Sequence, residues 1–195
     1  MKKLLLILIL TLSFHSWVNA GDIKDFEIEG ISIGDSALKH FTKDLIKKNS
    51  FDYYNDKKFT PVQMPTLTFY KQYDYIDFDF KTNDKRYFIH ALYGVISYER
   101  NINDCYKQMD EIVVSMNKLF DNVEVGERYE EKRPGITGDP LGKSKATIVN
   151  FWFDNGDRAS VTCYDYSKEH GGRDNLTVGI QTKEQNDFLF NKAYK

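Results

Sequence analysis

The chain has 195 residues, with 41% hydrophobic and 15% aromatic content and a formal net charge of −2 at pH 7. This length suits one ordinary domain, and the apolar content excludes global disorder. A mildly acidic chain without a basic stripe is also a poor candidate for binding nucleic acid or anionic membrane surfaces.

The first twenty residues resemble a secretory leader. A short basic start, residues 1–3, precedes an apolar run over 4–12, and small residues lie just before Gly21. This pattern predicts a signal peptide that is cleaved after Ala20, and therefore a periplasmic or secreted protein. No later apolar stretch approaches the length of a membrane span, so we expect none after cleavage.

The first half of the remaining chain alternates between strand and turn patterns. Gly30 interrupts an alternating run as a β-bulge would, and Thr42 followed by Asp44 has the form of a helix cap. In chain order the patterns predict a strand at 25–33, a helix at 37–48 restarted at Thr42, an irregular segment at 51–64, and strands at 67–70, 75–80 and 86–98.

The second half begins with the clearest helix, which Asn103 or Asp104 can cap. One apolar stripe at spacings of three and four runs along it and includes Cys105. A long break over 127–144, rich in glycine and proline, is expected to be a functional or a mobile loop. Strands at 146–154, 158–166 and 176–181 follow, with a hairpin turn at Asn155-Gly156 and a terminal helix opened by a capping box at 182–185.

These elements predict an α+β fold with an antiparallel sheet and helices packed on one face of it. The chain from 21 to 195 is then one secreted domain. Both halves, 21–100 and 101–195, share the order of one helix followed by three strands. Two α-β-β-β halves are the signature of an internal duplication, although any two hairpins that turn on asparagine look alike.

Cys105 and Cys163 are the two cysteines of the chain. An even pair in an oxidising compartment indicates one disulfide, and both cysteines fall on the apolar faces of their elements. The alternative is a pair of buried free thiols. Neither has a second cysteine or histidine at zinc-ligand spacing.

Gly34-Asp35-Ser36 resembles the first block of the GDSL esterases. That resemblance implies a serine hydrolase with Ser36 as its nucleophile. The late Asp-x-x-His block that supplies the base in this family is absent, and so is the Gly-x-Asn block. The alternative is that Gly34 makes a turn and that Asp35 or Ser36 caps a helix.

Two acidic clusters have the residue types of metal sites. Asp77, Asp79 and His90 could share one face of a hairpin, and the two aspartates could also form an acid–base pair. Acidic residues at 165–174 surround two glycines, as in a calcium-binding turn. Both patterns also describe solvated surfaces, and we expect no metal site and no cofactor.

Tyrosines crowd both predicted hairpins. Tyr73 and Tyr75 lie on the first hairpin, and Tyr164 and Tyr166 on the second. Exposed tyrosines on a sheet suit contact with a protein or a glycan, whereas cross-strand packing within the domain is the alternative.

The stretches 26–36, 153–156 and 160–165 are similar to those of small uncharacterised secreted bacterial proteins. The order of a strand, a Gly-x-x turn, a helix and an antiparallel sheet also resembles β-lactamase-inhibitor-like envelope modules in layout. The resemblance carries no activity. We expect a binding or interaction module for an envelope protein or glycan, with a serine hydrolase or a small-molecule-binding protein as alternatives; the sequence leaves the oligomeric state open.

Overall fold

The structure is a computed structural model, and it describes residues 22–68, 70–120, 123–132, 139, 142–169 and 171–195. The signal peptide inferred from the sequence lies outside these described residues.

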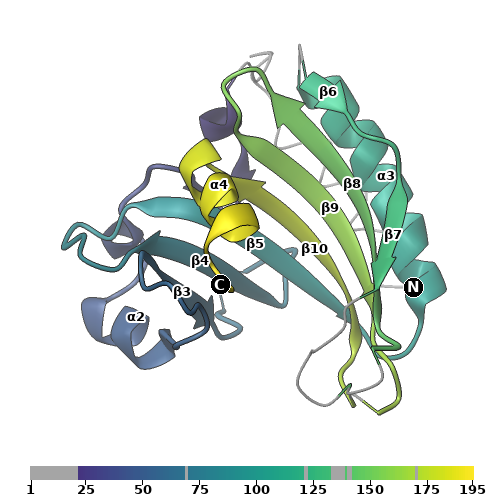
Figure 1. Ribbon diagram of the computed structural model, residues 1–195, viewed down its shortest axis with the longest axis horizontal. Coiled ribbons are helices and arrows are strands. Elements are labelled where there is room, and N and C mark those ends of the chain that lie inside the picture. Colours follow the sequence, from purple (N-terminus) through teal and green to yellow (C-terminus); the bar gives the residue numbers. More distant parts are fainter. Residues whose placement is uncertain (1–21, 69, 121–122, 133–138, 140–141, 170) are drawn as a thin grey trace.

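An eight-stranded antiparallel sheet occupies the centre of the molecule (Figure 1). Its strands are β3 (Phe59–Met64), β4 (Tyr75–Lys81), β5 (Ile89–Tyr98), β6 (Val123–Val125), β7 (Tyr129–Lys132), β8 (Lys145–Phe153), β9 (Arg158–Asp165) and β10 (Asp174–Gln181). The spatial order is β3-β4-β5-β10-β9-β8-β6, and β7 also pairs with β8.

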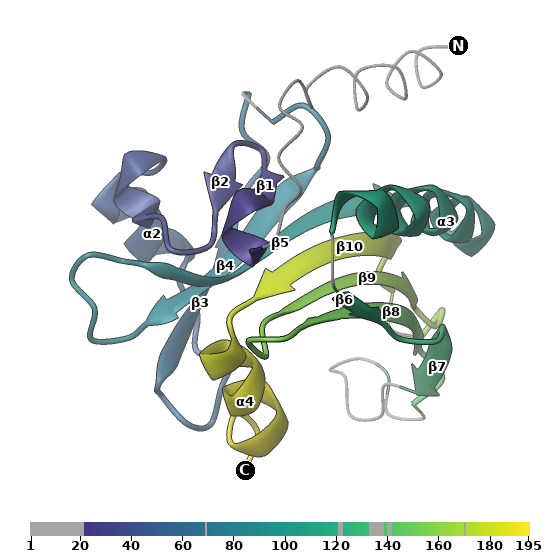
Figure 2. The ribbon, with the colours of Figure 1, turned by 90° about the horizontal axis from the view of Figure 1, so that it is seen from above.

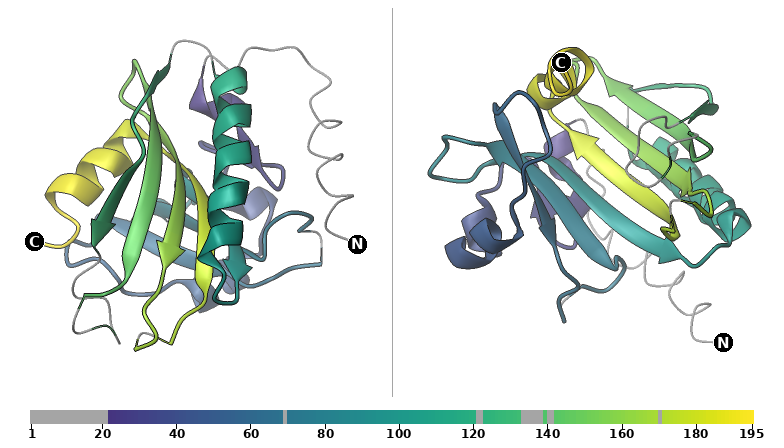
Figure 3. Two further views of the ribbon diagram at one scale, coloured as in Figure 1. Left: turned by 90° about the vertical axis from the view of Figure 1, so that its right-hand side faces the viewer. Right: turned by 60° about the horizontal axis from the view of Figure 1, so that its bottom comes forward.

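The sheet bends into an arch with two different sides (Figure 2). The smaller elements are η1 (Ile23–Asp25), β1 (Glu27–Ile28), β2 (Ile31–Ser32), η2 (Ala37–Lys39), α2 (Lys43–Asn49), α3 (Ile102–Leu119) and α4 (Lys183–Asn191). The hairpin of β1 and β2, together with α2 and α3, lies on the outer side of the arch, while α4 lies on the inner face (Figures 2 and 3).

Strand alternation explains why the main core lies on the outer side. Along β9, Ala159, Val161 and Cys163 are fully buried beneath α3 and belong to the main apolar cluster. The helix adds the buried side chains of Met109 and Met116, which come from the apolar stripe seen in the sequence. The alternate residues of β9 are polar and point to the inner face.

The predicted α+β class with an antiparallel sheet is confirmed, with one difference in the helices. All helices were predicted to lie on one face, but α4 packs on the inner face. Its Phe188 ring contacts the rings of Tyr54 and Phe59, with centroids 5.1 and 5.0 Å apart. These residues form a small apolar cluster separate from the main core, and this second core holds α4 there.

The two halves of the chain show the predicted order of a helix and three antiparallel strands. α2 precedes β3, β4 and β5, and α3 precedes β8, β9 and β10. The last strands of the two halves, β5 and β10, pair with each other and join the halves into one sheet. The short strands β6 and β7 are extra elements between α3 and β8.

The N-terminal region differs from the sequence expectation in its strands. Glu29 and Gly30 both have positive φ and form the turn of the β1–β2 hairpin, where one strand with a bulge was expected. The break at Thr42 is confirmed, because its side chain accepts a hydrogen bond from Leu45 N at the start of α2.

Two strand assignments in the middle of the chain were wrong. β3 forms within the segment expected to be irregular, and it includes Pro61, which an edge strand tolerates because it needs fewer ladder hydrogen bonds. The described residues of 67–70 do not form the expected strand; Leu67 packs against the main core instead.

Later boundaries also shift. Asn101 is the N-cap of α3, ahead of the expected Asn103 or Asp104. β7 forms inside the stretch 127–144 that was expected to be a loop, and the loop's residues 133–138, 140 and 141 lie outside the described part. Thr182 is the N-cap of α4 as predicted, and its hydroxyl accepts a hydrogen bond from Gln185 N. The reciprocal bond of a capping box is not formed, because the Gln185 side chain donates to Asp79 and Thr182 N donates to the carbonyl of His90.

The predicted disulfide between Cys105 and Cys163 is confirmed. Their Cα atoms lie 6.0 Å apart, and the bond links the start of α3 to the far end of β9. Both residues are fully buried. The bond therefore fastens the helix to the sheet across the main core.

Replacing both cysteines, Cys105→Ala with Cys163→Ala, should lower the free energy of unfolding by about 4 kcal/mol, because a bond across 58 residues restricts the unfolded chain. Urea unfolding without reductant measures the change. Wild type in reductant is the control and should lose a similar amount; an unchanged urea midpoint in both would contradict the prediction.

Candidate functional site

The inner face of the arch is the candidate site. Residues that pair across β5, β10, β9 and β8 point to the same side of the sheet. The side chains on the inner face are mostly polar or aromatic, whereas their sequence neighbours form the apolar core. The inner-face residues include Tyr93, Thr177, Gln181, Arg158, Ser160, Thr162, Tyr164, Ile148, Asn150 and Trp152, with the apolar Ala91, Val95 and Ala146 in the same rows.

Arg158 lies at the centre of the most distinctive group on this face. Its guanidinium carbon lies 5.6 Å from the ring centroid of Trp152 and 5.3 Å from that of Phe190 on α4. Its Nε donates to Gln181 Oε1 at 2.7 Å, and Nη2 donates to the same oxygen. Gln181 in turn donates to the hydroxyl of Tyr93. Two aromatic rings and one amide thus fix the guanidinium.

In the described part of the chain no carboxylate lies within ion-pair distance of Arg158, and the charge of Glu131 acts on it only from farther away. Both described hydrogen bonds of its side chain go to the neutral Gln181. Burial lowers the pKa of the Arg158 guanidinium from its ordinary value. Because a desolvated cation is stabilised mainly by an opposite charge, this group is suited to receive an anion from outside.

Asn150 adds an unused acceptor close to the same group. Its Nδ2 donates to the hydroxyl of Tyr129 at 3.3 Å. Its Oδ1 is buried and makes no hydrogen bond within the described residues. Ser160 and Thr162 on the next strand are also buried polar residues. Buried polar atoms without partners are uncommon in folded domains, so Asn150 Oδ1 adds an unused acceptor to this part of the inner face.

The tyrosines singled out in the sequence divide between the two sides. Tyr164 and Tyr166 stack with ring centroids 5.8 Å apart. Tyr75 lies beside them on the inner side of β4, and burial followed by the charge of Asp77 raises the pKa of its phenol. Tyr73 lies elsewhere: its ring fills the space above Gly94 and packs against the main core.

Asp77 and Asp79 do share one side of β4, as the sequence analysis expected. Burial raises the pKa of each carboxyl to about 7. Asp79 accepts a hydrogen bond from Tyr54 at 2.8 Å and another from Gln185 of α4. This carboxyl therefore links β4 to the inner-face helix.

The other sequence candidates lie apart from the inner-face group. Ser36 caps η2, and its hydroxyl donates to the carbonyl of Arg86 at 2.5 Å and accepts from Leu38 N. His90 lies 3.4 Å from Thr182 Oγ1 and 4.0 Å from Glu184. Within the described residues, no group of three acidic, histidine or cysteine side chains is arranged to hold a metal ion.

The acidic stretch 165–174 is also dispersed. Glu169 pairs with Lys143 at 2.6 Å, and Asp174 accepts a hydrogen bond from Tyr166 N. His170 lies outside the described residues. The carboxylates of this turn thus serve local contacts in the structure.

The group around Arg158 was not predicted from the sequence. The signal was present, because Arg158, Ser160 and Thr162 alternate with the apolar residues of the same strand. Phe190 could not be assigned to this group without knowing that α4 folds onto the inner face.

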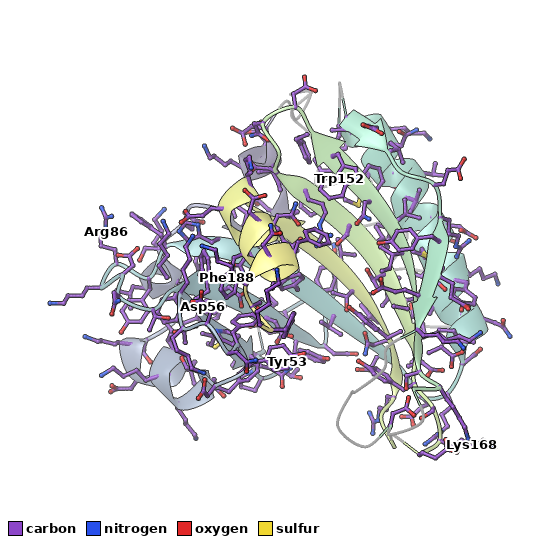
Figure 4. The ribbon with its side chains drawn as sticks, in the orientation of Figure 1. Tyr53, Asp56, Arg86, Trp152, Lys168 and Phe188 are labelled. Carbon is purple, nitrogen blue, oxygen red and sulfur yellow. A yellow bond between two sulfur atoms is a disulfide. The ribbon has the colours of Figure 1, made fainter. Side chains whose placement is uncertain are left out.

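Two hollows open to solvent away from the Arg158 group. One, of about 310 Å³, lies at the edge of β3 and is lined by aromatic residues that include Phe51 and Tyr53; Figure 4 shows Tyr53 beneath Phe188 of α4. The other, of about 490 Å³, is lined by residues from Lys81 to His90.

Along the described chain no helix has the length and apolar character needed to cross a membrane.

Comparisons with protein-family models, curated proteins and solved structures give no match to this chain. The geometry of the inner face is therefore the basis for a functional hypothesis.

The raised pKa values of the aspartates predict a pH dependence of stability. The ordinary pKa of an unfolded aspartate is about 3.9, so the folded state binds the Asp79 proton more tightly. Its contribution is full below about pH 4 and is lost as the pH rises to about 7.

The variant Asp79→Asn should remove this contribution, because the amide does not ionise and its oxygen still accepts from Tyr54 and Gln185. The difference in unfolding free energy between wild type and variant should shift in favour of the variant from pH 4 to pH 7. Urea titrations across this range measure it, with Glu124→Gln at an exposed carboxylate as the control. A difference that is constant with pH would contradict the assignment.

Proposed function

We propose that the protein is a binding module that holds a partner protein of the cell envelope on the inner face of its sheet. The observation that carries this proposal is the Arg158 group: a half-buried cation between two aromatic rings, beside a buried amide oxygen that makes no hydrogen bond with the described residues. The envelope location rests on the signal peptide inferred from the sequence.

The composition of the inner face supports a protein as the partner. Tryptophan, tyrosine and arginine carry most of the binding energy in protein interfaces, and Trp152, Tyr129 and Arg158 lie together here. Phe190 is 62% exposed and Tyr129 is 43% exposed. Exposed aromatic side chains around a polar group are typical of protein–protein interfaces.

The alternatives from the sequence have less geometric support. In the described part of the chain, the hydrogen bonds of Ser36 Oγ go to backbone atoms, and none joins it to a histidine base. A small-molecule site needs an enclosed pocket with a few convergent polar groups. The two hollows described above open widely to solvent and lie away from Arg158.

Replacing the central ring, Trp152→Ala, should weaken partner binding by at least about tenfold, because the ring is both a contact and a wall of the Arg158 group. The measurement is affinity capture of the tagged mature protein after mild cross-linking in its native envelope, followed by quantitative mass spectrometry. Tyr164→Ala tests the second part of the same face.

Val114→Ala is the matched control, because Val114 is an exposed apolar residue on α3, on the outer side of the arch. The proposal predicts a protein that wild type and this control capture equally and the inner-face variants do not. Equal capture by all variants would refute it, and so would a partner that proves to be a glycan.

A further inference from the structure

We propose that Arg158 binds a carboxylate of the partner protein, from an aspartate or glutamate side chain, and that this contact anchors the complex. This inference rests on the proposed function of the inner face and adds the chemical class of the group that is recognised.

The guanidinium has free donors in a fixed orientation. Nε and Nη2 share the single oxygen Oε1 of Gln181, and Nη1 makes no hydrogen bond with the described residues. Gln181 is itself 2% exposed and held by Tyr93. The planar fork of arginine matches a carboxylate in two parallel hydrogen bonds, and a fork that is already held loses little freedom on binding.

The charged groups around Arg158 suit a ligand that carries a single negative charge. Cations on neighbouring elements are paired: Lys183 lies 2.5 Å from Asp187, and Lys145 lies 3.0 Å from Glu130. Arg158, by contrast, has no carboxylate within ion-pair distance among the described residues, and Glu131 acts on its charge only from farther away. One guanidinium balances one carboxylate, whereas a phosphate dianion would need a second cation.

The aromatic rings beside the guanidinium favour an acidic side chain of a polypeptide over a small free carboxylic acid. Trp152 and Phe190 flank the guanidinium, and Phe190 is 62% exposed. Their faces would contact the methylene groups and the neighbouring backbone of an acidic residue in a polypeptide. A small free carboxylate would leave these apolar surfaces in water, so it should bind more weakly.

The test uses a pair of blocked tripeptides, acetyl-Ala-Glu-Ala-amide and acetyl-Ala-Gln-Ala-amide, with sodium acetate as a third probe. Binding is followed by the NMR signal of the Arg158 Nε–H group. We expect a saturable shift with the glutamate peptide, and at least tenfold weaker binding of the glutamine peptide and of acetate. The glutamate peptide should also bind more weakly as salt concentration rises.

Two variants separate recognition from a structural role of Arg158. Arg158→Lys keeps the charge but loses the fork. Gln181→Glu supplies a carboxylate from the chain itself, which should occupy the fork while the protein stays folded. Each variant should weaken binding of the glutamate peptide at least tenfold. Binding to the variants is monitored through the NMR signals of the backbone amides of neighbouring residues. Arg128→Lys is the control, because Arg128 is already paired with Asp110 at 2.9 Å.

The outcomes distinguish this inference from the proposed function. Equal affinity for the two peptides, acetate binding as tight as the glutamate peptide, or unchanged binding in Arg158→Lys would each overturn the carboxylate anchor. In that case the function still stands if Trp152→Ala loses the captured protein while Gln181→Glu keeps it. If both Trp152→Ala and Gln181→Glu still capture the protein, the proposed function itself is refuted.

Discussion

The pairing of β5 with β10 is the interaction on which the rest of the structure depends. These strands are the last of their respective halves, and their ladder runs from Asp174 opposite Tyr98 to Gln181 opposite Ala91. Each half alone offers a three-stranded meander with an open edge. Joined, they form one arch whose outer side packs a continuous core and whose inner face brings Tyr93 next to Gln181 and, one strand further, Arg158.

Much of this fold was predictable because its signals are local. The apolar stripe of α3, the Asn155-Gly156 hairpin and the cap of α4 depend on residues within a few positions of each other. The disulfide was predictable for a related reason, since both cysteines fall on apolar faces and the chain has no other cysteine. β3 was not predictable in this way, because the sheet overrides the local effect of Pro61.

The candidate site was less predictable than the fold. The sequence grouped Tyr73, Tyr75, Tyr164 and Tyr166 as candidate contact residues, but Tyr73 fills the space above Gly94, whereas Tyr75 lies close to the stacked Tyr164 and Tyr166. The Arg158 group combines β8, β9, β10 and α4, so it depends on strand order and on the side that the last helix takes. Sequence periodicity gives the side of a strand but not which strands are neighbours.

The disulfide holds α3 at one end only. Cys105 lies in the first turns of the helix, while the last turn is held by packing of Phe120, whose ring lies 5.0 Å from Phe153 and 5.6 Å from Phe26. Reduction of the disulfide therefore removes the covalent link near the start of α3 and leaves the aromatic contacts at its end. The first turns then depend on noncovalent packing alone, that of Ile102, Tyr106 and Met109 on the main core, so we expect reduction to lower their local stability more than that of the last turn.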